Sequence, residues 1–217
     1  MIPVGDVIPS RTPPRVTVAI LVVYAAAWLM RQQWPGETFP QILTQGVAPA
    51  HFSWLAASAG LFLHVGLVQA ASNAIALWIC GRTVEDRLGH ARFLTFYLLT
   101  GYAGSLAAVW AAPASVTPVL AASAAVGGVI GGYLALFPKS RILILVPSRD
   151  GLDVVEIPAA VLPGFWFLSQ LLWSLGSPPT ADSSVGMWAH LGGGAAGALA
   201  VWIFRQPARL KVEWWGA

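Results

Sequence analysis

The sequence predicts an all-α membrane protein with six transmembrane helices packed into one bundle. Hydrophobic residues make up 57% of the 217 positions and charged residues only 10%, whereas soluble domains contain about 25% charged residues. The apolar residues gather in six segments, and the basic residues lie between these segments rather than within them. These observations indicate an integral membrane protein rather than a soluble one.

Each apolar segment is a candidate helix, because a membrane-spanning helix needs about 20 mostly apolar residues. The six candidates are residues 16–30, 61–80, 93–112, 118–137, 158–175 and 187–204. The first is short, and its alanines at 25–27 would also suit a signal peptide, which is the less favoured interpretation because a strongly basic flank is missing. We therefore expect residues 16–204 to form one six-helix domain.

The connections between the candidate helices differ in composition. Residues 31–60 form a long stretch with several tryptophans, which is typical of a segment lying in the membrane interface. Residues 81–92 are predicted to form a charged turn, and residues 139–156 a polar loop containing a short β-hairpin. Residues 176–186 are predicted to be a flexible loop, because glycine, proline and serine dominate them.

The positions of the basic residues predict the orientation of the bundle. With six spans, all twelve Lys and Arg residues except Arg31 fall on the same side of the bilayer as the two termini. Cytoplasmic loops carry an excess of Lys and Arg. Residues 1–15 and 205–217 are therefore predicted to be cytoplasmic arms of a protein in a bacterial plasma membrane.

The same composition argues against several partners. Because the basic residues lie at helix ends, the formal net charge of +3 does not indicate a nucleic-acid partner. The single cysteine, Cys80, and four scattered histidines do not have the spacing of a zinc site. The lipid bilayer is the expected environment.

A serine stands out in the fourth apolar segment. Ser123 is followed by Gly127 and Gly131 at helical spacing, so the three residues share one stripe of the predicted helix. Glycines in such a stripe allow a second helix to approach the backbone closely. Ser123 is predicted to lie roughly 8 Å below the outer surface, at a rise of 1.5 Å per residue.

A histidine in the sixth segment has a matching environment. His190 is followed by Gly193, Gly194 and Gly197 on one helical face, and it is predicted to lie roughly 6 Å deep on the same side. Polar groups within a bilayer are costly and tend to mark function. The residues therefore suggest a Ser123–His190 dyad between two glycine-lined helices, although each residue alone would also suit simple helix packing.

The second segment adds two amides. Gln69 and Asn73 are four residues apart and share a helical face, so they could line the same outward-facing pocket or bond across helices. His64 lies about half a turn out of phase with Asn73, and we expect it to serve another purpose.

These residues occur within four motifs, FLHVGLVQAASNAIAL, GRTVEDRLG, AASAAVGGVIGGYLALFP and AHLGGGAAG. In order and spacing they resemble the rhomboid intramembrane serine proteases over nearly the whole chain. The resemblance implies a six-helix rhomboid bundle that cleaves transmembrane segments of other proteins near their outer ends. It also implies that the loop at 176–186 covers the site and that the protein uses neither a metal nor an organic cofactor.

The resemblance implies roles for individual residues. Ser123 matches the nucleophile, His190 the general base and Asn73 the side-chain donor of the oxyanion hole. Gln69 stands where the family usually has a second histidine, and its amide can still donate a hydrogen bond. The backbone N–H of Ser123 would be a further oxyanion donor.

The chain departs from the family pattern around the nucleophile. Ala121 and Ala124 replace the glycines of the usual Gly-x-Ser-Gly, and Gly127 replaces an aromatic residue that supports the catalytic histidine. A second hypothesis is therefore an inactive rhomboid-like protein that binds transmembrane helices or is an accessory subunit of a larger membrane complex. A third, a small transporter or channel, is disfavoured because the six segments contain no Asp or Glu.

Overall fold

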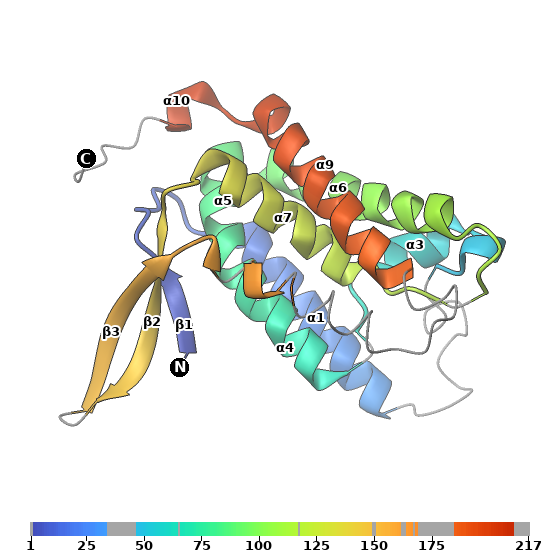
Figure 1. The fold of residues 1–217 in the computed structure, drawn as a ribbon, viewed down its shortest axis with the longest axis horizontal. Helices are drawn as coiled ribbons and strands as arrows, with labels where there is room; N and C mark the ends of the chain where they lie inside the picture. The colour runs from blue at the N-terminus through green and yellow to red at the C-terminus, as the bar shows by residue number, and fades with distance from the viewer. Residues whose placement is uncertain are drawn as a thin grey trace.

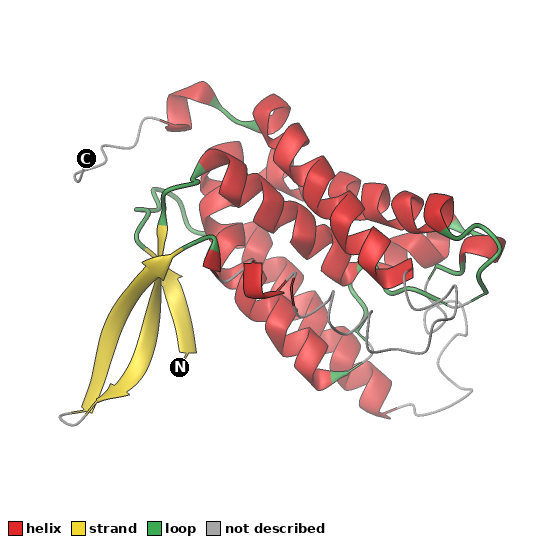
Figure 2. Ribbon diagram, in the orientation of Figure 1, coloured by secondary structure: helices red, strands yellow, loops and turns green. Residues whose placement is uncertain are grey.

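The structure is a computed structural model in which a bundle of helices has a small β-sheet at one end (Figure 2). It describes residues 2–33, 47–64, 66–116, 118–148, 151–161, 164–166, 168 and 185–210. The elements are β1 (Ile2–Asp6), α1 (Arg15–Gln33), η1 (Pro49–His51), α3 (Trp54–Gly60), α4 (Leu67–Ala76), η2 (Leu77–Gly81), α5 (Arg82–Leu88), α6 (His90–Ala111), α7 (Ala122–Leu136), β2 (Arg141–Ser148), β3 (Gly151–Pro158), α9 (Val185–Phe204) and α10 (Pro207–Leu210).

Helices α6, α7 and α9 form the centre of the bundle, and α9 lies along α7 in Figure 1. Glycines allow this contact. A Cβ on Gly131 would overlap the carbonyl group of Gly194, and a Cβ on Gly197 would overlap the carbonyl group of Gly128. The two backbones therefore touch directly, which only residues without a side chain permit.

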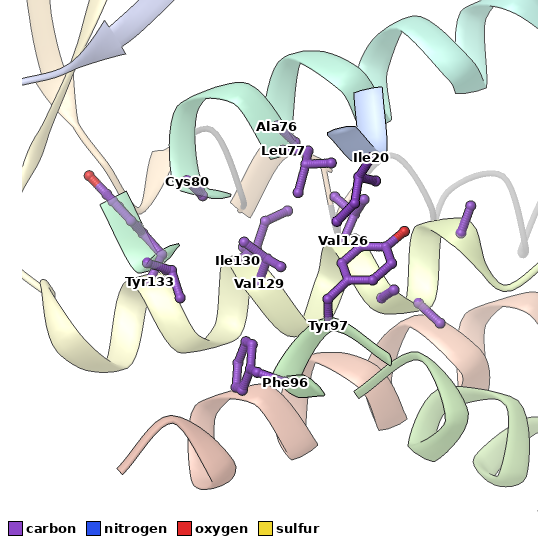
Figure 3. Packing of buried hydrophobic residues seen from close by; sticks show 14 of the residues in the cluster. Ile20, Ala76, Leu77, Cys80, Phe96, Tyr97, Val126, Val129, Ile130 and Tyr133 are labelled. Atoms are coloured by element: carbon purple, nitrogen blue, oxygen red, sulfur yellow. The ribbon is translucent and has the colours of Figure 1, made fainter. Parts of the chain in front are cut away.

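A second layer of apolar side chains joins α7 to the helices on its other faces (Figure 3). Phe96 and Tyr97 reach the core from α6, and Leu77 reaches it from η2. Val126 and Ile130 of α7 lie against them and are fully buried. Close-packed interiors of this kind fix side-chain positions, so α7 is held on every face.

The second predicted segment and the charged turn after it need correction. Residues 61–64 form a turn, and the helix begins at Leu67 rather than at residue 61. It then continues through η2 into α5, so the stretch predicted as a charged turn is helical up to Leu88. The only break is Gly89, whose φ of 81° lies in the left-handed region that favours glycine.

This charged stretch is helical because its buried charges find partners. The Glu85 carboxylate accepts hydrogen bonds from the backbone N–H groups of Val16 and Thr17 at 2.9 and 2.8 Å, and also contacts His90. The N–H groups in the first turn of a helix have no intrahelical partner and favour negative charge. Glu85 thus caps α1 from a distant helix.

The N-terminal arm is also more ordered than its composition suggests. Asp86 accepts hydrogen bonds from the backbone N–H groups of Arg11 and Thr12, and it pairs with Arg87. Buried charges of this kind are tolerated only when they are paired and hydrogen-bonded. The described part of the arm is therefore fixed against α5 through Arg11 and Thr12.

The predicted β-hairpin at 139–156 is confirmed by β2 and β3, which pair in antiparallel register. The sequence gives too little signal for β1, which pairs with β2 and makes the sheet three-stranded. The all-α prediction is wrong in this respect. Asp6 at the end of β1 links the sheet to the bundle by accepting hydrogen bonds from Thr83 and Tyr133 at 2.7 and 3.0 Å.

The helix ends otherwise lie close to the predicted ones, with one exception. Helix α7 begins at Ala122 rather than at residue 118, because Val119 pairs with Val47 in an isolated antiparallel bridge. Within the described residues, α6 and α9 are long and apolar enough to cross a membrane, whereas α7 and the first part of α1 are apolar but shorter. Most of the predicted segment at 158–175, nearly all of the loop at 176–186 and the end of the tail lie outside the described residues.

We expect Gly197→Ala to destabilise the protein, since the added methyl group would overlap the carbonyl group of Gly128. Overpacking of this kind typically costs about 1–3 kcal/mol. The matched control is Gly186→Ala in the same helix, where a Cβ would meet nothing within 4 Å. Thermal unfolding in detergent should show a lower midpoint for Gly197→Ala only. Equal midpoints for the two variants would contradict the close approach of α7 and α9.

Candidate active site

Ser123 lies in the first turn of α7, immediately after the segment that the Val47–Val119 bridge holds in place. Its side chain is buried, with 4% of the residue exposed. As the second residue of the helix, Ser123 has one of the backbone N–H groups that a helix leaves without an intrahelical partner. The positive end of the helix dipole therefore lies beside its hydroxyl group.

His190 is buried in the first half of α9 and contacts Ser123 directly. Its Nε2 atom lies 2.6 Å from Ser123 Oγ, and 7% of the residue is exposed. A neutral imidazole with its proton on Nδ1 accepts the serine proton at Nε2. The pair has the geometry of a nucleophile and its general base.

Glycines in the contact between α7 and α9 allow Ser123 and His190 to come this close. Gly193 faces the carbonyl of Ala124, one residue after the serine, and a Cβ there would overlap it. Gly127 faces the backbone of His190 itself, since a Cβ at Gly127 would lie 3.3 Å from the His190 carbonyl oxygen. The structure thus places all four predicted glycines, Gly127, Gly131, Gly193 and Gly197, in the α7–α9 contact.

Asn73 has an amide available for a ligand. The residue is 1% exposed and lies in α4, which packs against α7. Neither Asn73 Nδ2 nor Asn73 Oδ1 has a hydrogen-bond partner among the described residues. A buried amide without a partner is costly, and a bound group that supplies one would remove that cost. Gln69 lies one turn earlier on the same helix and is only half-buried.

The ring of Trp166 packs on His190, a contact that the residue pattern did not reveal. The two ring centroids are 5.0 Å apart, and the ring planes are inclined by 65°. Trp166 Cη2 also lies 3.8 Å from the position that a Cβ on Gly127 would take. The indole therefore fills space that the missing side chain of Gly127 leaves open. The sequence contains one hint of this contact, which is that Gly127 stands where the family usually has an aromatic residue.

The alanine that follows the nucleophile, Ala124, is accommodated by a glycine on a third helix. Ala121 and Ala124 are fully buried. A Cβ on Gly104 of α6 would lie 2.6 Å from the Cβ atom of Ala124 and would overlap the carbonyl of Ala189. Gly104 thus makes room for the methyl group of Ala124.

His64 lies just before α4, where its ring contacts Tyr24 edge-on with centroids 4.4 Å apart. Within the part of the chain that the structure describes, no group of three His, Cys, Asp or Glu side chains could hold a metal ion. The described part of the site offers the serine hydroxyl, the imidazole and nearby hydrogen-bond donors.

Comparison with known proteins places this chain in a family. The Rhomboid domain matches residues 51–207, the range that contains Asn73, Ser123 and His190. The chain is 33% identical over 151 residues to "Rhomboid protein 1, mitochondrial" of Saccharomyces cerevisiae, covering 67% of this chain and 39% of that protein. No solved structure is similar enough to count as a match.

Two further relatives bear the name protease. "Rhomboid protease GluP" of Bacillus subtilis is 32% identical over 108 residues, which cover 50% of this chain and 21% of that protein. "Rhomboid-like protease 3" of Toxoplasma gondii is 24% identical over 202 residues, covering 92% of this chain and 71% of that protein. The chain thus spans well under half the length of the yeast and Bacillus relatives. With most of its length matched by the domain, the chain belongs to the rhomboid family of multi-pass helical membrane proteins.

Proposed function

We propose that this protein is an intramembrane serine endopeptidase that cleaves transmembrane segments of other proteins, with Ser123 as nucleophile and His190 as general base. The observation that supports this best is the 2.6 Å contact between Ser123 Oγ and His190 Nε2 in a buried, glycine-lined helix contact. Membership of a family that includes intramembrane proteases gives the reaction class.

The proposed reaction assigns one step to each of these groups. Ser123 Oγ attacks the carbonyl carbon of the scissile peptide bond while His190 Nε2 takes the hydroxyl proton. The resulting oxyanion is stabilised by the Asn73 amide and the Ser123 backbone N–H at the positive end of α7. His190 then donates its proton to the leaving nitrogen, and the peptide bond breaks to leave an acyl group on Ser123. Water, with His190 again as base, releases that acyl group.

The substrate class follows from where the dyad lies. Ser123 and His190 are on helices of an apolar bundle, so a polypeptide reaches them from within the membrane or at its surface. A helical segment hides its peptide carbonyls in its own hydrogen bonds. We therefore propose that the substrate segment unwinds locally before the attack.

We further propose a six-span domain at residues 16–204, with cytoplasmic arms at 1–15 and 205–217, in a bacterial plasma membrane. Contacts at one end of the bundle support the proposal that the basic residues lie on one side of the membrane. Arg82 pairs with Asp6 at 2.9 Å, and Arg209 donates to the backbone carbonyl of Asp86 at 3.2 Å. The sheet and α10 also lie at this end of the bundle in Figure 1.

The alternative is a rhomboid-like protein that binds transmembrane helices without cutting them, or an accessory subunit of a larger membrane complex. The observation that favours it is the replacement of both flanking glycines by buried alanines, Ala121 and Ala124. Extra methyl groups beside the nucleophile restrict the backbone that must receive the oxyanion.

We expect a fluorophosphonate probe to label the wild-type protein at Ser123, because the adjacent imidazole activates the hydroxyl group. Labelling should disappear in Ser123→Ala and in His190→Ala, measured by in-gel fluorescence in detergent and in liposomes. Ser105→Ala is the control, since that buried serine donates only to the carbonyl of Gly101 within its own helix. A folded wild-type protein that stays unlabelled would instead favour the inactive alternative.

Asn73→Ala should lower the rate of labelling about 100-fold, as expected when one oxyanion-hole donor is lost. The variant should nonetheless unfold at the wild-type temperature or above it, because the Asn73 amide has no hydrogen-bond partner to lose among the described residues. Gln69→Ala on the same helical face is the comparison, with a smaller expected effect. A wild-type rate in Asn73→Ala would remove Asn73 from the oxyanion hole.

The proposed orientation predicts which engineered cysteines react from outside the cell. Val116 follows α6 and Leu152 lies in β3, and both are exposed. In a Cys80→Ala background, Val116→Cys should react with a membrane-impermeant maleimide on intact cells. Leu152→Cys should react only after permeabilisation. The reverse pattern would place the sheet outside and overturn the orientation.

A further inference from the structure

The side chain of His190 is poorly fixed by hydrogen bonds alone. Its Nε2 contacts Ser123, but its Nδ1 atom has no hydrogen-bond partner among the described residues. In a Ser-His-Asp triad, a carboxylate at that second nitrogen holds the ring in orientation. Packing must therefore orient the imidazole here.

The side chain that packs on the ring is Trp166, on the short helical stretch at 164–166. It is 9% exposed and meets the imidazole in an edge-to-face arrangement, with centroids 5.0 Å apart. Aromatic pairs favour this arrangement because the positive edge of one ring faces the negative face of the other. Trp166 thus limits rotation of the His190 ring.

Gly127 provides the space for this contact. A Cβ at Gly127 would lie 3.3 Å from the His190 carbonyl oxygen and 3.8 Å from Trp166 Cη2. An aromatic side chain on α7 would compete with the indole for the same volume. The absence of a side chain on α7 and the presence of the tryptophan are therefore complementary.

We infer that Trp166 is a positioning residue that orients His190 toward Ser123, in place of an aromatic side chain at position 127. The inference rests on the proposed function, because positioning matters only if His190 acts as a base. It also implies that the orientation of the base depends on a third segment, outside the two helices on which the dyad lies.

The test measures the rate at which a fluorophosphonate labels Ser123 in the purified full-length protein. Trp166→Ala should slow labelling by about 10- to 100-fold, since small displacements of catalytic groups have effects of this size. Trp166→Phe should keep most of the rate because it retains an aromatic ring. Trp110→Ala is the matched control, since Trp110 is exposed on α6 and contacts Trp188 rather than the dyad.

A second-site variant separates positioning from general packing. In Trp166→Ala, the further change Gly127→Tyr should restore part of the rate, because the volume left by the indole can hold a ring attached to α7. In the wild-type background the same Gly127→Tyr change should lower the rate by crowding Trp166. The labelling rate of Trp166→Ala should also keep rising with pH, as expected when the base no longer assists the serine.

A wild-type labelling rate in Trp166→Ala would overturn the inference. The inference would also be overturned if Trp166→Phe labelled as slowly as a folded Trp166→Ala and if adding Gly127→Tyr to Trp166→Ala gave no increase in rate. NMR of the histidine rings gives a readout independent of activity, since the chain has only four histidines. The His190 ring resonances should move in Trp166→Ala because the indole ring current is lost, and unmoved resonances would overturn the inference. An unlabelled wild type with moved resonances would contradict the proposed function and, with it, the positioning role.

Discussion

The direct contact between the backbones of α7 and α9 is the constraint on which the rest of this structure depends. Gly131 lies against Gly194, and Gly197 lies against Gly128, where any side chain would overlap a carbonyl group. Within a membrane, helices gain little from hydrophobic burial against one another, so close packing and short contacts decide their association. The same approach distance that holds the two helices together also brings His190 within hydrogen-bond reach of Ser123.

A second anchor works at the opposite end of the bundle, through paired charges. Glu85 caps the N-terminus of α1, and Asp86 holds the segment before it, so the first helix is tied to α5 by charge-assisted hydrogen bonds. Asp6 connects β1 to the same region through Tyr133 of α7. The Ser123–His190 contact lies at one end of α7 and the charged network at the other, and the helix between them keeps the two apart.

Two of the positions where this chain departs from the rhomboid pattern, Ala124 and Gly127, are accommodated by residues on other segments. The methyl group of Ala124 occupies space that Gly104 on α6 leaves open. The space above Gly127 is filled by Trp166, which packs on the imidazole. Well-packed interiors tolerate substitution best when the total volume is kept, and in both pairs a small residue lies beside a larger one. A change beside the nucleophile therefore has to be judged together with the residues that surround it in space.

The sequence by itself determined the membrane class, the helical periods and most of the helix ends, because hydropathy and spacing are local properties of the chain. It also identified Ser123, His190 and Asn73 as candidates, because polar residues are conspicuous in apolar segments. Only the tertiary structure decided that α4 starts at Leu67, that the charged stretch is helical and that β1 joins the hairpin. The last two depend on partners far away in the chain, and so does the contact of Trp166 with His190, which no local pattern encodes.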